Sequence, residues 1–197
     1  MRDLGRARRA LAEADRNSDE IDRSLWLAKA ADYALKGTAV LVGGAAVNLH
    51  TRVYRPTDVD MCAYLDEEDR QALRDLGFEQ IQGDHFAYTF SDGERWPVEF
   101  PGSVVDGEWA PVKLNETEAV EVITLESLIV DRITQATDGT DVTFVEAVRL
   151  CFATYDRASW DWIEADIHRR TLLRGGPRLL ETYEGVLADV RGLRKSL

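Results

Sequence analysis

The chain has 197 residues, 45% of them hydrophobic, which is enough for one larger domain or two small ones with a core. Its formal net charge of -12 is of the sign that usually repels nucleic acid. No apolar run approaches the roughly 20 residues that cross a bilayer, and no apolar signal core follows the charged N-terminus, so we expect neither membrane insertion nor secretion.

The basic residues are unevenly divided, with 4 Lys against 20 Arg. Many acids with few Lys suggest adaptation to high internal salt, where the Debye length is only about 3 Å at 1 M and net charge says little about substrates. The alternative is an acidic protein from an ordinary cytoplasm. Cys62 and Cys151 lie far apart and form no paired-cysteine motif, which suits a reducing compartment. We therefore predict a cytoplasmic protein.

Two helices are predicted before residue 38. Apolar residues at helical spacing predict the first over residues 1–16, with four arginines on its other positions. These arginines could touch phosphates, although a solvated or acid-pairing face is the more ordinary interpretation. The second begins at Asn17 as N-cap and ends at Gly37, which is free to take the left-handed conformation.

Strands and turns dominate the middle of the chain. Residues 38–42 are a nearly continuous apolar run, as expected for a buried strand, and Gly43-Gly44 turns the chain. The following segments are predicted as a short helix over 45–49, a strand over 57–64, a helix over 66–76, and strands over 78–81, 85–90 and 95–100. Residues 102–112 are predicted as a surface loop and 119–123 as a final strand at a sheet edge.

From residue 124 the pattern becomes helical, with helices predicted over 124–136, 143–155, 159–170 and 177–194. We therefore predict an α+β chain in three parts. N-terminal helices over 1–37 pack on an α/β domain over 38–123, and an all-helical domain over 124–197 follows.

The candidate site combines a glycine pair with two aspartates. Gly43-Gly44 after a buried strand lets the backbone approach a ligand, and the helix that follows offers N–H groups to anions. Thirteen residues separate Gly44 from Asp58, and Asp58 and Asp60, spaced i and i+2, point to one face of a strand. Two such carboxylates predict a bound cation, Mg²⁺ or Mn²⁺, and hence a nucleoside triphosphate as its metal complex.

Each half of this pattern is weak alone, because Gly43-Gly44 can be a plain turn and the aspartates a solvated strand face. The order and spacing strengthen it, while no glycine-rich dinucleotide or Walker motif accompanies it. Val42-Gly-Gly44 with Asp58-Val-Asp-Met61 resembles the signature of the nucleotidyltransferase fold of the polymerase-β superfamily. That resemblance implies a small mixed β-sheet with flanking helices, followed by a helical domain.

Within this superfamily, the chain more closely resembles small bacterial and archaeal members that include abortive-infection and toxin–antitoxin nucleotidyltransferases. These commonly read Gly-Gly-Ala-Ala/Leu-x-x-Leu-His, then Arg-x-Thr-x-Asp-x-Asp. Here residues 43–50 match the first motif, and residues 55–60 match the second with one residue fewer between Thr57 and Asp58. The core of the resemblance covers residues 38–100.

The resemblance also implies a third carboxylate on a neighbouring antiparallel strand. Glu99 is the best candidate, where it would help to ligate the metal and orient the acceptor hydroxyl. Asp is more usual at that place, and Glu99 as an ordinary exposed strand residue is the alternative. Asp92 and Asp106 lie in predicted turns and are weaker choices.

The nucleotide itself is predicted to meet Gly43, Gly44, Arg55 and Thr57, and the resemblance implies a basic residue facing the cleft, for which Arg132 is the candidate. Arg55 could instead pair with Asp58, Thr57 could be an ordinary strand-start residue, and Asp131 with Arg132 could be structural. Among the histidines, His50 fits a helix cap better than a base, and the sequence shows no partner for His85 or His168.

These features together predict a metal-dependent nucleotidyltransferase. It would move a nucleoside monophosphate from a nucleoside triphosphate to a hydroxyl on a protein, a tRNA end or a small molecule, and release pyrophosphate. The alternative is a nucleotide- or partner-binding module of this fold without efficient catalysis, for example one half of a toxin–antitoxin pair. A purely structural domain is the third possibility.

Overall fold

A computed structural model describes residues 2–52, 56–174 and 177–196. The chain divides into two compact units, residues 1–123 and residues 124–197, which are described separately. None of the described helices is both long enough and apolar enough to cross a membrane.

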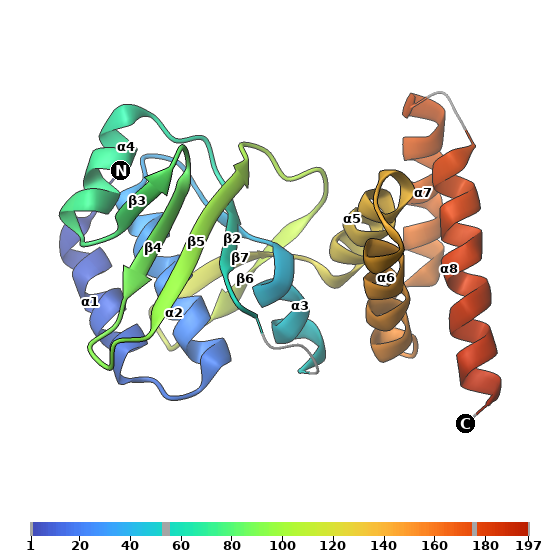
Figure 1. Cartoon of the computed structure of the whole chain (residues 1–197), viewed down its shortest axis with the longest axis horizontal. Coiled ribbons are helices and arrows are strands. Elements are labelled where there is room, and N and C mark those ends of the chain that lie inside the picture. The colour runs from blue at the N-terminus through green and yellow to red at the C-terminus, as the bar shows by residue number, and fades with distance from the viewer. Residues whose placement is uncertain (1, 53–55, 175–176, 197) are drawn as a thin grey trace. The chain divides into compact units, whose positions relative to one another are not determined.

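The first unit is built on a seven-stranded mixed sheet, counted over the described residues, in the order β3-β4-β5-β2-β1-β7-β6 (Figure 1). The pairs β1/β7 and β2/β5 are parallel and the other neighbours are antiparallel. The strands are β1 (Val40–Leu41), β2 (Val59–Cys62), β3 (Glu79–Gln82), β4 (His85–Thr89), β5 (Arg95–Gly102), β6 (Trp109–Lys113) and β7 (Ala119–Ile123).

Helices cover one face of this sheet. They are α1 (Leu4–Arg16), α2 (Glu20–Ala34), α3 (Gly43–Thr51) and α4 (Glu67–Asp75), and Figure 1 shows α1 and α2 behind the strands. Alternate side chains of β2, Val59 and Met61, are fully buried, whereas Asp60 between them is half-buried. Each buried side chain of this size stabilises the fold by about 1.5–3 kcal/mol. The sheet therefore has an apolar face under the helices and a face that carries the acids.

Two of the four N-terminal arginines pair with acids, Arg2 just before α1 and Arg6 within it, while Arg8 and Arg9 are exposed. Arg2 bonds the carboxylates of Asp66, Glu68 and Asp69, and Arg6 bonds Glu118. These contacts attach α1 to α4 and to the segment before β7, so Arg2 and Arg6 have structural partners within the unit.

Both predicted ends of the second helix are wrong. Asp19, not Asn17, caps α2, because its carboxylate accepts from the N–H groups of Ile21 and Asp22. The Asn17 amide instead donates to the carbonyl of Glu13 in α1. Gly37 does not take a positive φ, since α2 already ends at Ala34 and Leu35 is extended.

The predicted loop over residues 102–112 and the predicted edge position of β7 are also wrong, for one reason. Trp109–Lys113 forms the edge strand β6, which pairs with β7, so β7 lies between β6 and β1. β6 is mostly exposed and contains Pro111, which an edge strand tolerates.

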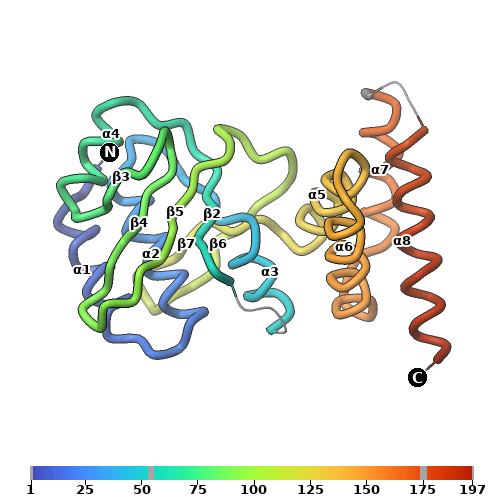
Figure 2. The backbone as a smooth tube through the Cα atoms, in the orientation of Figure 1, coloured from blue at the N-terminus to red at the C-terminus, as the bar shows by residue number. Residues whose placement is uncertain are grey.

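The second unit is all-helical, as expected for residues 124–197. Figure 2 shows its helices, which are α5 (Leu125–Asp138), α6 (Asp141–Thr154), α7 (Trp160–Arg174) and α8 (Arg178–Lys195). Its core includes Ile133, Cys151, Ile163 and Val190, all fully buried. Burial raises the pKa of the Cys151 thiol to about 12, so this thiol is unreactive at neutral pH.

The cluster around Asp66 predicts a pH effect on stability. The Lys36 ammonium, 2.6 Å from Asp66 Oδ2, and the N–H of Asp69 lower the pKa of the Asp66 carboxyl from 3.8 to about 2. A depressed folded-state pKa gives stability that is present above the unfolded value and is lost as pH falls toward the folded value. We expect the first unit to lose stability between pH 4 and pH 2 and Asp66→Asn to lose less, because Asn still caps α4 but does not titrate.

Thermal unfolding across that pH range tests this, with Asp75→Asn at the other end of α4 as the matched control. The exposed Asp75 carboxylate accepts from the neutral Gln71 amide, so the control is expected to keep the wild-type pH dependence. Equal acid sensitivity of Asp66→Asn and wild type would contradict the assignment.

Candidate functional site

Gly43 and Asp60 fit together at the start of α3. Gly43 has φ +61°, and a Cβ at this position would lie 1.8 Å from Asp60 Oδ2 and 2.6 Å from its Cγ. Only glycine therefore allows the carboxylate to lie over the first residue of the helix. The Val42 N–H donates to the Asp60 carbonyl at 2.9 Å, which fixes the two segments side by side.

The start of α3 favours negative charge. Its N-cap residue is Val42, whose side chain makes no capping hydrogen bond. The unpaired N–H groups of a first turn and the helix dipole attract anions, and here the Asp60 carboxylate lies beside them. Gly44, the second residue of α3, is buried. The predicted glycine turn and one predicted aspartate thus lie together.

Asp58 is close to Asp60 in the chain, but it lies in a bend just before β2 and is half-buried. The strand predicted over residues 57–64 is shorter than expected because β1 pairs only as far as Leu41, opposite Met61. Beyond Val42 the chain turns at Gly43 into α3, so the pairing of β1 with β2 does not extend to residue 58. Thr57 is exposed, and Arg55 lies outside the described residues.

The third predicted acid, Glu99, lies in register with Asp60 on the adjacent strand β5. Paired residues of neighbouring strands point to the same face, so both carboxylates belong to the acidic face of the sheet. β5 runs parallel to β2, which corrects the antiparallel neighbour that the resemblance implies. The intervening α4 and the β3–β4 hairpin return the chain in the direction of β2.

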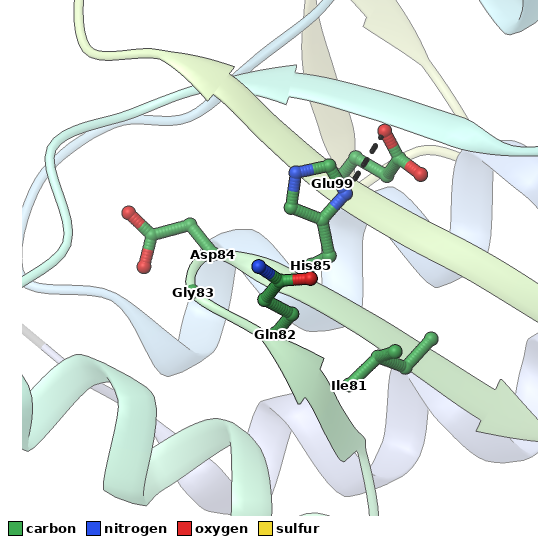
Figure 3. A pocket seen from close by; sticks show the side chains of 6 residues that line it. All are labelled: Ile81, Gln82, Gly83, Asp84, His85 and Glu99. Carbon is green, nitrogen blue, oxygen red and sulfur yellow. Dashed lines mark ion pairs between the residues drawn. The ribbon is translucent and has the colours of Figure 1, made fainter.

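Glu99 also has a partner on the next strand. Its Oε2 lies 3.3 Å from Nδ1 of His85, the residue opposite it on β4, and Figure 3 shows the two side chains directed at each other. About a third of the Glu99 side chain and half of the His85 side chain are exposed. Asp60, Glu99 and His85 therefore form a row across β2, β5 and β4.

An open hollow of about 470 Å³ lies beside this row, at the β3–β4 turn. Figure 3 shows its lining residues, Ile81, Gln82, Gly83, Asp84, His85 and Glu99. The Asp84 carboxylate is held by the Arg70 guanidinium, with Arg70 Nε 2.7 Å from Asp84 Oδ1. Glu99 thus lines the hollow and is also in register with Asp60, whose carboxylate lies over the start of α3.

The donor set suits a hard divalent cation, because Asp58, Asp60 and Glu99 all offer carboxylate oxygens. However, no three His, Cys, Asp or Glu side chains among the residues that the structure describes gather in a group that could hold a metal ion. Glu99 instead faces His85. The residues fit Mg²⁺ or Mn²⁺ in the kind of their ligand atoms, although as they lie they do not form a three-acid site.

The other candidates occupy separate places. In α5, Arg132 donates to Gln135, which in turn donates to Asp131. The His50 ring contacts the Ile123 carbonyl and connects α3 with β7. Arg23 bonds Asp92, and Asp106 lies between β5 and β6. His168 lies 3.7 Å from Glu164 on its own helix.

The sequence shows no partner for His85, yet a signal for one exists. β4 and β5 form a hairpin around Ser91-Asp-Gly93, and Gly93 has a positive φ. Residues at equal distances from Asp92 pair across such a hairpin, as Thr89 and Arg95 do. Counting outward by seven residues on each side places His85 opposite Glu99.

The chain has a nucleotidyltransferase-like fold. It is similar to the crystal structure of an antigenic nucleotidyltransferase-like protein from Paracoccidioides brasiliensis, with a TM-score of 0.54 over 85% of this chain and 93% of that one. The two sequences are 17% identical, so the likeness concerns the fold alone. No family model and no curated protein matches the chain.

Proposed function

We propose that the chain binds a nucleoside triphosphate with Mg²⁺ or Mn²⁺ at Gly43–Asp60 and transfers its nucleoside monophosphate to a hydroxyl. The observation that carries this proposal is the Asp60 carboxylate over Gly43, in register with Glu99. The turn at Gly43 has no room for a side chain, the N-cap residue Val42 makes no capping bond, and an acid lies beside the helix start. This combination suits a metal-bound triphosphate better than a solvated strand face.

Each residue has a definite task in this proposal. The backbone at Gly43 and Gly44 would receive phosphate oxygens at the helix start. Asp58, Asp60 and Glu99 would hold the cation, which when bound neutralises charge on the phosphates. Glu99 would also orient the acceptor hydroxyl toward the α-phosphate. Thr57 and Arg55 are proposed as further phosphate contacts.

A second candidate function has its own support. Glu99 faces His85, and the described acids form no group of three that could hold a metal ion. A chain that keeps this arrangement would bind a metal-nucleotide without efficient transfer, for instance as one half of a toxin–antitoxin pair with a protein partner. The two candidates share the nucleotide site and differ in whether Glu99 joins it.

Amide NMR and label transfer together test both candidates. We expect a nucleoside triphosphate with Mg²⁺ to shift the Gly43 and Gly44 amides, and Mn²⁺ to broaden those of Asp58 and Asp60 by its paramagnetism. Incubation with each α-labelled nucleoside triphosphate and candidate acceptors, at low and high salt, then measures transfer.

Shifts at Gly43 and Gly44 together with label transfer support the transferase. Shifts at Gly43 and Gly44 without label transfer support the binding module. A triphosphate that leaves the Gly43 and Gly44 amides unmoved at every salt concentration overturns both.

A further inference from the structure

We propose that the hollow at the β3–β4 turn is the acceptor site, and that it takes a hydroxyl-bearing molecule without phosphate groups. This inference rests on the proposed function and specifies its acceptor. It excludes a tRNA end or any other nucleic acid as the acceptor.

The location of the hollow supports this. Asp60, Glu99 and His85 occupy successive strands, and neighbouring strands lie about 4.8 Å apart. The helix start that would receive the triphosphate lies on the Asp60 side of Glu99, and the hollow lies on the His85 side. A molecule in the hollow therefore meets the nucleotide across Glu99.

In-line transfer requires such an arrangement, with the attacking oxygen and the leaving pyrophosphate on opposite sides of the α-phosphorus. The acceptor oxygen forms a bond to the α-phosphorus, and the bond from that phosphorus to the bridging oxygen breaks. Pyrophosphate leaves with the electron pair. The hydroxyl proton passes to the Glu99 carboxylate and from there to water.

The lining determines the chemical class. Among the residues that the structure describes, it contains two carboxylates, Asp84 and Glu99, and neither Lys nor Arg. Arg70 already pairs with Asp84 through two hydrogen bonds, so its charge is neutralised within that pair. The Gln82 amide and the His85 imidazole can bond hydroxyls, and the half-exposed Ile81 offers an apolar contact. A phosphate in the hollow would be repelled by the Glu99 carboxylate, and no arginine or lysine of the described lining is placed to offset that repulsion.

Three sugars serve as matched probes: glucosamine, glucose and glucose 6-phosphate. We expect saturable shifts of the amides of residues 81–85 with glucosamine and glucose, and at least tenfold weaker binding of glucose 6-phosphate. Gln82→Arg places a cation on the exposed strand β3 and is expected to reverse that preference. Gln71→Arg, the same change on the exposed face of α4, is expected to leave it unchanged.

The readouts separate the two proposals. Unmoved Gly43 and Gly44 amides with a nucleoside triphosphate and Mg²⁺ overturn the proposed function. Unmoved amides at residues 81–85 with all three sugars, while Gly43 and Gly44 respond to nucleotide, overturn the acceptor site alone. Equal or tighter binding of glucose 6-phosphate, or of a short RNA, at these amides also overturns it.

Discussion

Asp58→Asn combined with Asp60→Asn is expected to abolish the paramagnetic effect of Mn²⁺ at Gly43 and to reduce label transfer at least about 100-fold. Loss of a residue that only supports a metal ligand typically costs 10–100-fold in metal affinity or activity, so loss of two proposed ligands should cost more. Asn is nearly isosteric with Asp, and the fold should survive the change.

The matched control replaces two exposed helical acids of the same unit, Asp22→Asn with Asp75→Asn. It changes the net charge by the same amount and leaves the site intact. Wild-type Mn²⁺ broadening and transfer are expected for the control. Transfer that persists in the Asp58 and Asp60 double variant would exclude these acids from the mechanism.

Gly43→Ala is expected to be the most destabilising single substitution in the site. An L-residue in the left-handed region costs about 1–2 kcal/mol, and the added methyl group overlaps Asp60 Oδ2 at 1.8 Å, which adds about 1–3 kcal/mol of overpacking. Chemical denaturation followed through amides of the first unit should therefore show a loss of about 2–5 kcal/mol. The displaced Asp60 should also weaken Mn²⁺ binding.

Gly83→Ala is the matched control for this substitution. Gly83 has φ +54°, close to that of Gly43, but a Cβ there meets no atom within 4 Å. Gly83→Ala is expected to lower the free energy of unfolding only by the cost of the left-handed backbone, about 1–2 kcal/mol. Mn²⁺ should still broaden the amides of the site. Equal losses in the two variants would mean that the contact with Asp60 adds nothing.

The order of secondary structure in the centre of the site follows from local chemistry. The sequence predicts a strand before Gly43, a turn at Gly43 and a short helix, because an apolar run, a glycine pair and small residues leave few alternatives. The structure has β1, a positive φ at Gly43 and α3 at these places. The nucleotidyltransferase-like fold that the motif implies is also confirmed.

The predictions fail where the structure depends on residues distant in the chain. Whether β7 is an edge strand depends on β6, whose Pro111 and exposed side chains lack the alternation of a half-buried strand. The direction of β5 beside β2 depends on the connection through α4 and a hairpin, which no local pattern of Glu99 contains. The partner of Glu99 is determined by the register of β4 and β5. His85 can be identified as that partner only by counting residues across the hairpin.

The position of the Asp60 carboxylate over the start of α3 has a further consequence for how the proposed ligands bind. Carboxylate and triphosphate compete for one positive helix end and repel each other unless a cation lies between them. Metal and nucleotide affinities are then reciprocal: whatever factor the cation adds to nucleotide affinity, the nucleotide adds to cation affinity. Such a site responds to the joint presence of both ligands and discriminates against metal-free nucleotide.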